Sequence, residues 1–110
     1  MNIAQIAKMA QQMQSQVAQA QDELKETTLE ATAGGGAVRV VITGAGEMRA
    51  IEIDPSAVDP AEVEMLQDLV LTAVNDAITR AKELERERMG RIAGGLGLPG
   101  MPGLPGLSTR

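Results

Sequence analysis

The stretch from Arg49 to Ser56, RAIEIDPS, places two carboxylates and a hydroxyl within five residues. Hard oxygen ligands in such a group are typical of hydrolytic or divalent-cation sites. Those sites need convergent carboxylates, whereas Glu52 and Asp54 fall on one face of a short strand that then turns away. An Asp-Pro-Ser sequence is also typical of a turn, because Asp side chains bond the backbone two residues on. We therefore expect Asp54 and Ser56 to form a turn.

The composition removes most catalytic and cofactor chemistry. The 110 residues include no Cys and no His, so thiolate or imidazole metal ligands, disulfides and the usual general base are missing. We expect a protein that is not an enzyme, holds no cofactor or metal and takes no small-molecule substrate. The chain also lacks Phe, Tyr and Trp, so nucleic-acid bases cannot stack on aromatic rings. No apolar run is long enough for a membrane span, which predicts a cytoplasmic protein without membrane contact.

Charge is unevenly distributed along this chain, whose net charge is -5. Residues 47–76 hold one Arg and eight acidic residues, whereas residues 77–110 hold six basic and three acidic residues. A nucleic-acid interface would use the bases of the later segment, assisted by two lysines near the N-terminus: Arg80, Lys82, Arg86, Arg88, Arg91, Lys8 and Lys25. The alternative is a solvated helix end, where the bases complement the helix dipole and pair with neighbouring glutamates.

Two long helices must position these bases. Apolar residues recur at spacings of three and four from Ile3 to Leu24, which predicts a helix over residues 3–25. A second periodic stretch follows Asp59-Pro60, a sequence typical of an N-cap and the first helical residue. It predicts a helix over residues 60–89 that ends at Gly90. At 1.5 Å per residue the two helices would span roughly 35 and 44 Å.

Three short alternating segments lie between these helices: TLEATA, AVRVVITG and MRAIEID. Gly-rich turns separate them, which predicts an antiparallel meander of three strands. We place Val38 and Ile42 on one face of the middle strand, and Met48 and Glu52 on one face of the third. The predicted fold class is α+β, with a three-stranded antiparallel sheet flanked by two helices in the order α-β-β-β-α.

The predicted helices are longer than the predicted sheet. Strands of this length span about 20 Å, so an apolar helix stripe overhangs the sheet. An exposed stripe of Ile, Met, Val and Leu needs a second chain. We therefore expect an obligate homodimer with twofold symmetry.

Three stretches together resemble the YbaB/EbfC family of bacterial nucleoid-associated proteins: MAQQMQSQVAQAQDEL, GGGAVRVVITGAGEMRAIEIDPSAV and EMLQDLVLTAVNDAITRAKELERERM. The resemblance covers residues 3–93, and the combination of the Val- and Gly-containing hairpin, then IDPS, then DLVLTAVNDA is specific to that family. It implies a tweezer-like homodimer that binds double-stranded DNA in the nucleoid with little sequence preference, organises the chromosome and affects transcription. It transfers no single DNA-contacting residue, so the bases named above depend on charge placement alone.

Two functional hypotheses follow. In the first, residues 1–93 form one DNA-binding and dimerisation domain, and residues 94–110 form a flexible Gly/Pro/Leu-rich tail. In the alternative, the long amphipathic helices dock another protein of replication or repair, and the acidic segment repels DNA, so that the chain is an interaction module without direct DNA binding.

Overall fold

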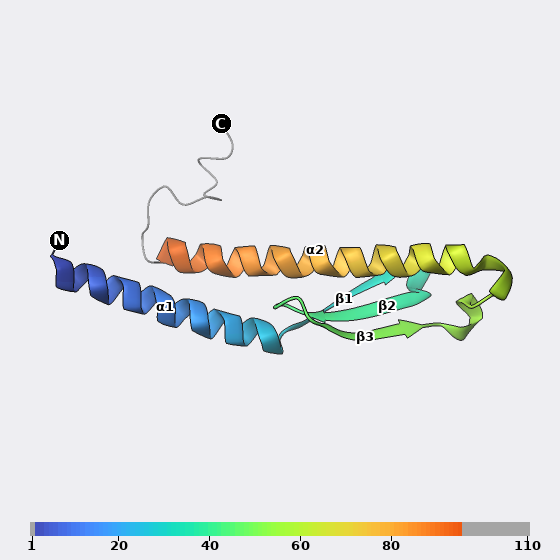
Figure 1. Cartoon of the computed structure of the whole chain (residues 1–110), viewed down its shortest axis with the longest axis horizontal. Helices are drawn as coiled ribbons and strands as arrows, with labels where there is room; N and C mark the ends of the chain where they lie inside the picture. Colours follow the sequence, from blue (N-terminus) through green and yellow to red (C-terminus); the bar gives the residue numbers. More distant parts are fainter. Residues whose placement is uncertain (1, 96–110) are drawn as a thin grey trace, which may run out of the picture.

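A computed structural model describes residues 2–95 of the chain. The elements are α1 (Ile3–Glu26), β1 (Thr28–Ala33), β2 (Val38–Thr43), β3 (Met48–Ile53) and α2 (Val63–Gly95), with single 3-10 turns at Gly34–Gly36, Pro55–Ala57 and Pro60–Glu62. The molecule is elongated, with extents of 69 × 34 × 16 Å. Both helices project beyond the same end of the sheet and run side by side there (Figure 1). The α+β class, the element order and the overhanging helices confirm the sequence-based predictions.

The sheet is antiparallel with the strand order β1-β2-β3, and α2 lies over β1 and β2. Three alanines spaced four residues apart, Ala73, Ala77 and Ala81, form the buried stripe of α2. Such small side chains let the helix approach closely the Val and Ile side chains of β2. The resulting core is thin, and Leu24, Ile42, Val38 and Val40 are its largest fully buried apolar side chains.

β3 lies beside this core rather than under α2. Val38 pairs with Ile53 and Val40 pairs with Ile51, so both isoleucines face the same side of the sheet as the core. They nevertheless remain 38% and 49% exposed, respectively. An apolar face of the sheet is therefore left open next to α2.

A β-bulge changes the face of one predicted residue. The register shifts between Val41 and Ile42, so that Ile42 pairs with Met48. Met48 therefore packs against the core, and the prediction that it shares a face with Glu52 is wrong. A bulge inserts one residue into a strand, and a simple alternation of side chains carries no signal for it.

Local hydrogen bonds explain where the helices begin. The Asn2 side chain accepts from the Gln5 amide at 2.8 Å, and the Gln5 side chain accepts from the Asn2 amide at 3.3 Å. This reciprocal capping box fixes the first turn of α1. The Asp59 side chain accepts from the Ala61 amide at 2.9 Å and caps a 3-10 turn that leads into α2.

The end of α2 differs from the prediction. Gly90 does not stop the helix, which continues to Gly95. A glycine inside a helix costs only about 1 kcal/mol relative to alanine, which the residues on either side can outweigh. The predicted tail over residues 94–110 therefore begins with two helical glycines, and residues 96–110 lie outside the described part of the chain.

Candidate nucleic-acid interface

The acidic stretch after β3 forms a turn. Asp54 Oδ1 accepts hydrogen bonds from the Ser56 amide at 3.0 Å and from Ser56 Oγ at 2.9 Å. These bonds, the backbone one first, lower the pKa of Asp54 because they favour the ionised carboxylate. Glu52 instead binds Arg39 on the neighbouring strand, with Oε1 2.9 Å from Nη1. The predicted turn is confirmed, and both carboxylates have structural partners.

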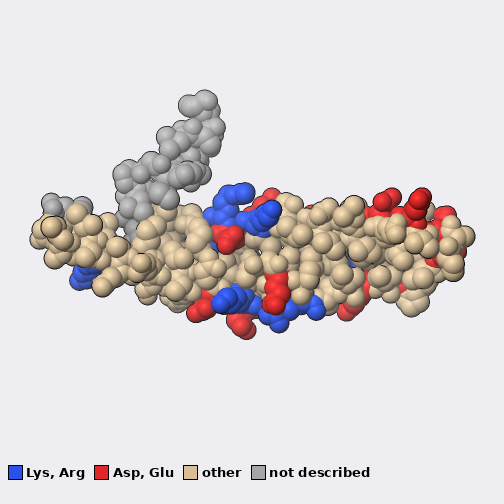
Figure 2. Space-filling view, viewed as in Figure 1, with Lys and Arg blue, Asp and Glu red and all other residues tan. Residues whose placement is uncertain are grey.

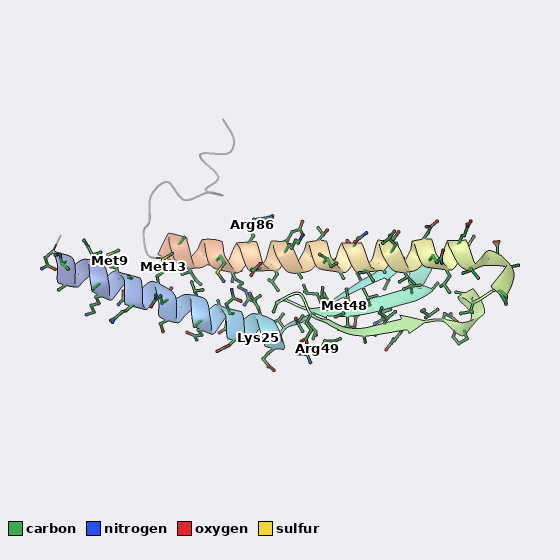
Figure 3. All side chains as sticks on the ribbon, viewed as in Figure 1. Met9, Met13, Lys25, Met48, Arg49 and Arg86 are labelled. Atoms are coloured by element: carbon green, nitrogen blue, oxygen red, sulfur yellow. The ribbon has the colours of Figure 1, made fainter. Side chains whose placement is uncertain are left out.

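Two of the predicted bases lie on the outer face of α2. Arg86 is nine residues beyond the buried Ala77, which is about 180° around a helix, and Lys82 precedes it by one turn. Figure 3 shows Arg86 pointing away from α1 and from the sheet. Neither side chain makes an ion pair with any residue between 2 and 95. This outer face is therefore a cationic surface that is open to an anionic partner.

Two other bases pair with carboxylates on their own helix. Arg80 Nε lies 3.2 Å from Asp76 Oδ2, and Arg91 Nη2 lies 3.4 Å from Glu87 Oε2. Both are pairs of residues four apart with exposed side chains. Ion pairs of this kind contribute only about 0.2–1 kcal/mol, so a phosphate group can replace the carboxylate. The prediction of pairing with helix glutamates is confirmed for Arg91, whereas Arg80 uses Asp76.

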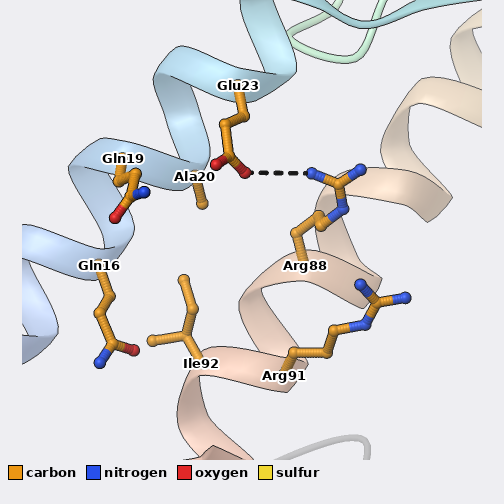
Figure 4. A pocket seen from close by; sticks show the side chains of 7 residues that line it. All are labelled: Gln16, Gln19, Ala20, Glu23, Arg88, Arg91 and Ile92. Carbon is orange, nitrogen blue, oxygen red and sulfur yellow. Dashed lines mark ion pairs between the residues drawn. The ribbon is translucent and has the colours of Figure 1, made fainter.

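Arg88 points toward α1 rather than toward solvent. Its Nη1 lies 3.6 Å from Glu23 Oε1, and its side chain is 26% exposed, the least of any ion-paired base in the described chain (Figure 4). Leu84 lies one turn earlier on the same side of α2 and contacts the end of β2 near Gly44. Arg88 therefore lies on the inner face of α2, in the part of the molecule beyond the sheet where α2 packs against α1.

A groove separates α1 from α2 next to this ion pair. It has a volume of about 470 Å³ and is lined by Gln16, Gln19, Ala20, Glu23, Arg88, Arg91 and Ile92 (Figure 4). Two arginine and two glutamine residues therefore line one opening, and the Arg91 guanidinium pairs with Glu87 on its own helix. Guanidinium and amide groups are typical donors to phosphate oxygens.

The two lysines of α1 lie away from these bases. Lys25 is in the last turn of α1, 3.9 Å from Asp22 Oδ1, and its backbone carbonyl accepts from Arg49 at 3.5 Å. Lys8 is seventeen residues earlier, which corresponds to roughly 26 Å along the helix. Figure 3 places Lys25 and Arg49 on the edge of the molecule opposite Arg86. The seven predicted bases therefore do not form one continuous patch.

The opposite end of the molecule is acidic. Figure 2 shows acidic side chains gathered where α2 begins, and the contributing segment is Asp59 to Asp68. Most positive side chains lie over the middle of the molecule, where acidic side chains lie among them. This asymmetry directs a polyanion away from the start of α2 and toward its second half.

The helix-dipole explanation of the basic residues does not hold. Because α2 runs on to Gly95, its last turn contains no basic residue. Dipole effects act within the last turn, so Arg86 and Arg88 are too far from the helix end to complement it. Arg88 instead makes a contact from the side of the helix, with Glu23.

Fold and surface together define a small α+β protein with two overhanging antiparallel helices, one of which has a cationic outer face. The chain belongs to the YbaB/EbfC DNA-binding family, whose family model matches residues 1–96. Within the described residues, no helix is long and apolar enough to cross a membrane.

Relatives of similar length carry one name. The chain is 52% identical over 96 residues to a nucleoid-associated protein of Acetivibrio thermocellus, covering 87% of this chain and 85% of that protein. It is 51% identical over 98 residues to a nucleoid-associated protein of Nocardia farcinica, covering 89% of each. The crystal structure of an uncharacterised protein from Helicobacter pylori superposes with a TM-score of 0.78 at 26% identity, covering 86% of this chain and 99% of that one. These matches confirm the resemblance and the fold.

Sequence reasoning missed the carboxylate that neutralises Arg88. Glu23 lies 65 positions earlier in the chain, so helical spacing within α2 gives no signal for this pair. The apolar spacing of α1 indicated only indirectly that Glu23 could reach a neighbouring helix. Glu23 precedes Leu24 and follows Ala20 by three residues, and both of these residues are buried.

Proposed function

We propose that this chain is a nucleoid-associated protein that binds double-stranded DNA as a homodimer with little sequence preference, in the cytoplasm and at the nucleoid. Its family is described as DNA-binding, and relatives with about half of their residues identical are named nucleoid-associated proteins. The observation that carries the proposal is the outer face of α2, where Lys82 and Arg86 make no ion pair within residues 2–95.

Phosphate neutralisation is the mechanism that these side chains support. Lys and Arg on an exposed helix face release counterions when they contact the DNA backbone, which favours binding to any sequence. The absence of Phe, Tyr and Trp in the chain removes base stacking as a contribution. Arg80 and Arg91 lie on other sides of α2, and Arg91 lines the groove toward α1; each can add a phosphate contact once its exposed carboxylate partner gives way.

A second copy of the chain is the occupant that we propose for the open apolar face. A hollow of about 430 Å³ between β3 and α2 is lined by Ile53, Val63, Leu66, Gln67, Val70, Leu71 and Val74, all apolar except Gln67. Leu71 is 60% exposed and Ile78 36% exposed, so an apolar ridge adjoins the hollow on α2. A ridge beside a hollow on one surface is self-complementary under a twofold axis.

Dimerisation also doubles the cationic surface. Each protomer offers one outer α2 face, and a duplex that contacts both gains affinity through the high effective concentration of the second contact. The acidic start of α2 repels the duplex, so the contacts fall on the overhanging halves of the helices. This arrangement fits chromosome organisation by a protein that grips the DNA backbone.

A salt titration of duplex binding tests this function. Affinity should fall steeply with salt, and the variant Lys82→Gln/Arg86→Gln should flatten the plot of log Kd against log salt by about 0.9 for each phosphate that is no longer neutralised. The matched control Arg39→Gln/Arg49→Gln removes the same charge from the sheet and should leave the slope nearly unchanged. Absence of binding at low salt would overturn the proposal in favour of an interaction module without DNA binding. A duplex affinity that does not depend on salt would instead overturn phosphate neutralisation as the mechanism.

A further inference from the structure

One ion pair connects the two overhanging helices. Within residues 2–95, the contact between Glu23 and Arg88 is the ion pair that joins α1 to α2, at 3.6 Å. Glu23 is 56% exposed on its side chain, whereas Arg88 is 26% exposed. The Arg88 side chain is therefore largely covered by the two helices, whereas the Glu23 side chain is open to solvent.

Without Glu23 the groove would carry the uncompensated charge of Arg88, whereas Arg91 keeps Glu87 as a partner on its own helix. Its polar lining consists of Arg88, Arg91, Gln16, Gln19 and Glu23, and the last is the acidic member of the set (Figure 4). Guanidinium and amide groups donate hydrogen bonds and match the oxygens of a phosphodiester. The Glu23 carboxylate pairs with the Arg88 guanidinium, and a phosphate oxygen in the same place would pair with the same group.

The pair is weak enough to exchange. A separation of 3.6 Å with one half-exposed member is typical of pairs that contribute about 0.2–1 kcal/mol. The high charge density of duplex DNA makes a phosphate a stronger partner for Arg88 at low salt. The Glu23 side chain is 56% exposed, so it can rotate away from Arg88 into solvent.

We infer that the groove between α1 and α2 is a phosphate-binding subsite whose own carboxylate, Glu23, competes with DNA for Arg88. This inference rests on the proposed DNA-binding function and adds a residue that lowers affinity. Glu23 keeps the bound state weak and reversible, because Arg88 must break an internal ion pair each time it binds DNA.

The test is the variant Glu23→Gln, which keeps the shape of the side chain and removes its charge. Duplex binding at low salt, followed by fluorescence anisotropy, should tighten about two- to fivefold. The slope of log Kd against log salt should steepen by up to about 0.9, since Arg88 no longer exchanges one anion for another. A residue that only holds the helices together would not steepen this slope.

Two further variants separate the specific effect from general charge. Glu26→Gln removes the same charge one turn further along α1, where no ion pair forms within residues 2–95, and should change affinity less. In an Arg88→Gln background, Glu23→Gln should lose most of its effect, as a double-mutant cycle requires for two groups that act on each other. Thermal melts of each variant test whether it is folded.

The outcomes are distinguishable. Absence of duplex binding by the unmodified chain at low salt overturns the proposed function and this inference with it. Binding by the unmodified chain, combined with equal effects of Glu23→Gln and Glu26→Gln or an effect that persists without Arg88, overturns the inference alone. Weaker binding by Glu23→Gln also overturns it, since Glu23 would then orient Arg88 for DNA instead of competing.

Discussion

Arg39 joins the three strands on the face of the sheet opposite α2. Its guanidinium binds Glu30 on β1 and Glu52 on β3, with Nη1 2.9 Å from the Glu52 carboxylate. The hydrogen bond from Arg39 lowers the pKa of Glu30, and the bonds to Glu30 and then Glu52 raise the pKa of Arg39. Opposite charges on neighbouring strands stabilise the pairing of a sheet. One side chain thereby contributes to both strand contacts.

The ion pairs of Arg39 with Glu30 and Glu52 make the free energy of unfolding depend on pH in a defined direction. A carboxyl group whose pKa is lowered in the fold contributes stability that is fully present above its unfolded pKa and is lost as pH falls through its folded pKa. We therefore expect Arg39→Gln to lower the urea midpoint modestly at neutral pH. The gap between variant and original chain should close as pH falls below 4.5, the ordinary value for Glu30.

Urea unfolding followed by circular dichroism at several pH values measures this gap. Lys8→Gln is the control, because it removes a positive charge from an exposed position without an ion pair in the described chain. A gap of constant size down to low pH would mean that Arg39 stabilises the sheet by packing rather than through its carboxylate partners.

Gly44 and Gly90 are glycines of two different kinds. Gly44 lies where two elements pack together, whereas Gly90 lies inside a helix with open space around it. A Cβ on Gly44, at the end of β2, would lie 2.8 Å from Leu24 Cδ2 and 3.1 Å from the Leu24 carbonyl oxygen. Leu24 is fully buried where α1 meets the sheet. A Cβ on Gly90, inside α2, would have no heavy atom within 4 Å. The first glycine is required by contact between elements, and the second is not.

We therefore expect opposite effects of two alanine substitutions. Gly44→Ala should lower the free energy of unfolding by about 1–3 kcal/mol, because it overpacks the junction of α1 with β2. Gly90→Ala should raise it by about 0.5–1 kcal/mol, because alanine favours the helical state. Chemical denaturation of both variants measures the difference. Loss of stability in Gly90→Ala would show that α2 does not continue through this position.

Much of the element order follows from local sequence patterns. Spacings of three and four predicted both helices, and alternation between Gly-rich turns predicted three strands, because these periods express which face each element buries. The bulge beside Met48 and the continuation of α2 past Gly90 were not predicted. Both depend on contacts or energies that outweigh a local preference.

The candidate surface was less predictable than the fold. Charge counting identified the segment that contains Lys82 and Arg86, but it grouped them with Arg88, which faces α1. A helical projection anchored on the buried alanines separates these residues, and it requires knowing which alanines are buried. The contact between Glu23 and Arg88 depends on how two helices that are far apart in the sequence pack together. The spacing of residues in the sequence does not reveal that packing.

The whole molecule has a charge gradient along its length and an apolar face on its side. The acidic start of α2 and the cationic second half lie apart along the same helix (Figure 2). The face formed by Ile51, Ile53 and Leu71 lies near the acidic part. If two copies meet at this face, the cationic halves remain outside the contact and available to a duplex.

Leu71→Asp is the substitution that tests this arrangement of the whole molecule. A charge placed on the exposed apolar ridge must be desolvated in a dimer but not in a monomer, so we expect dissociation at micromolar concentration. Thr72→Asp is the matched control, since Thr72 is about 100° further around α2 and exposed. Ultracentrifugation measures the mass of each variant, and circular dichroism measures its helix content.

Dissociation of the dimer should also weaken DNA binding. A monomer offers one cationic helix face, so its affinity for a duplex should fall by about 10²-fold or more if both faces contact the same DNA. Leu71→Asp should therefore bind weakly, while Thr72→Asp keeps most of its affinity despite carrying the same added charge. A Leu71→Asp variant that stays dimeric would place the twofold contact elsewhere on the molecule. A monomeric variant with unchanged affinity would show that each protomer binds DNA independently.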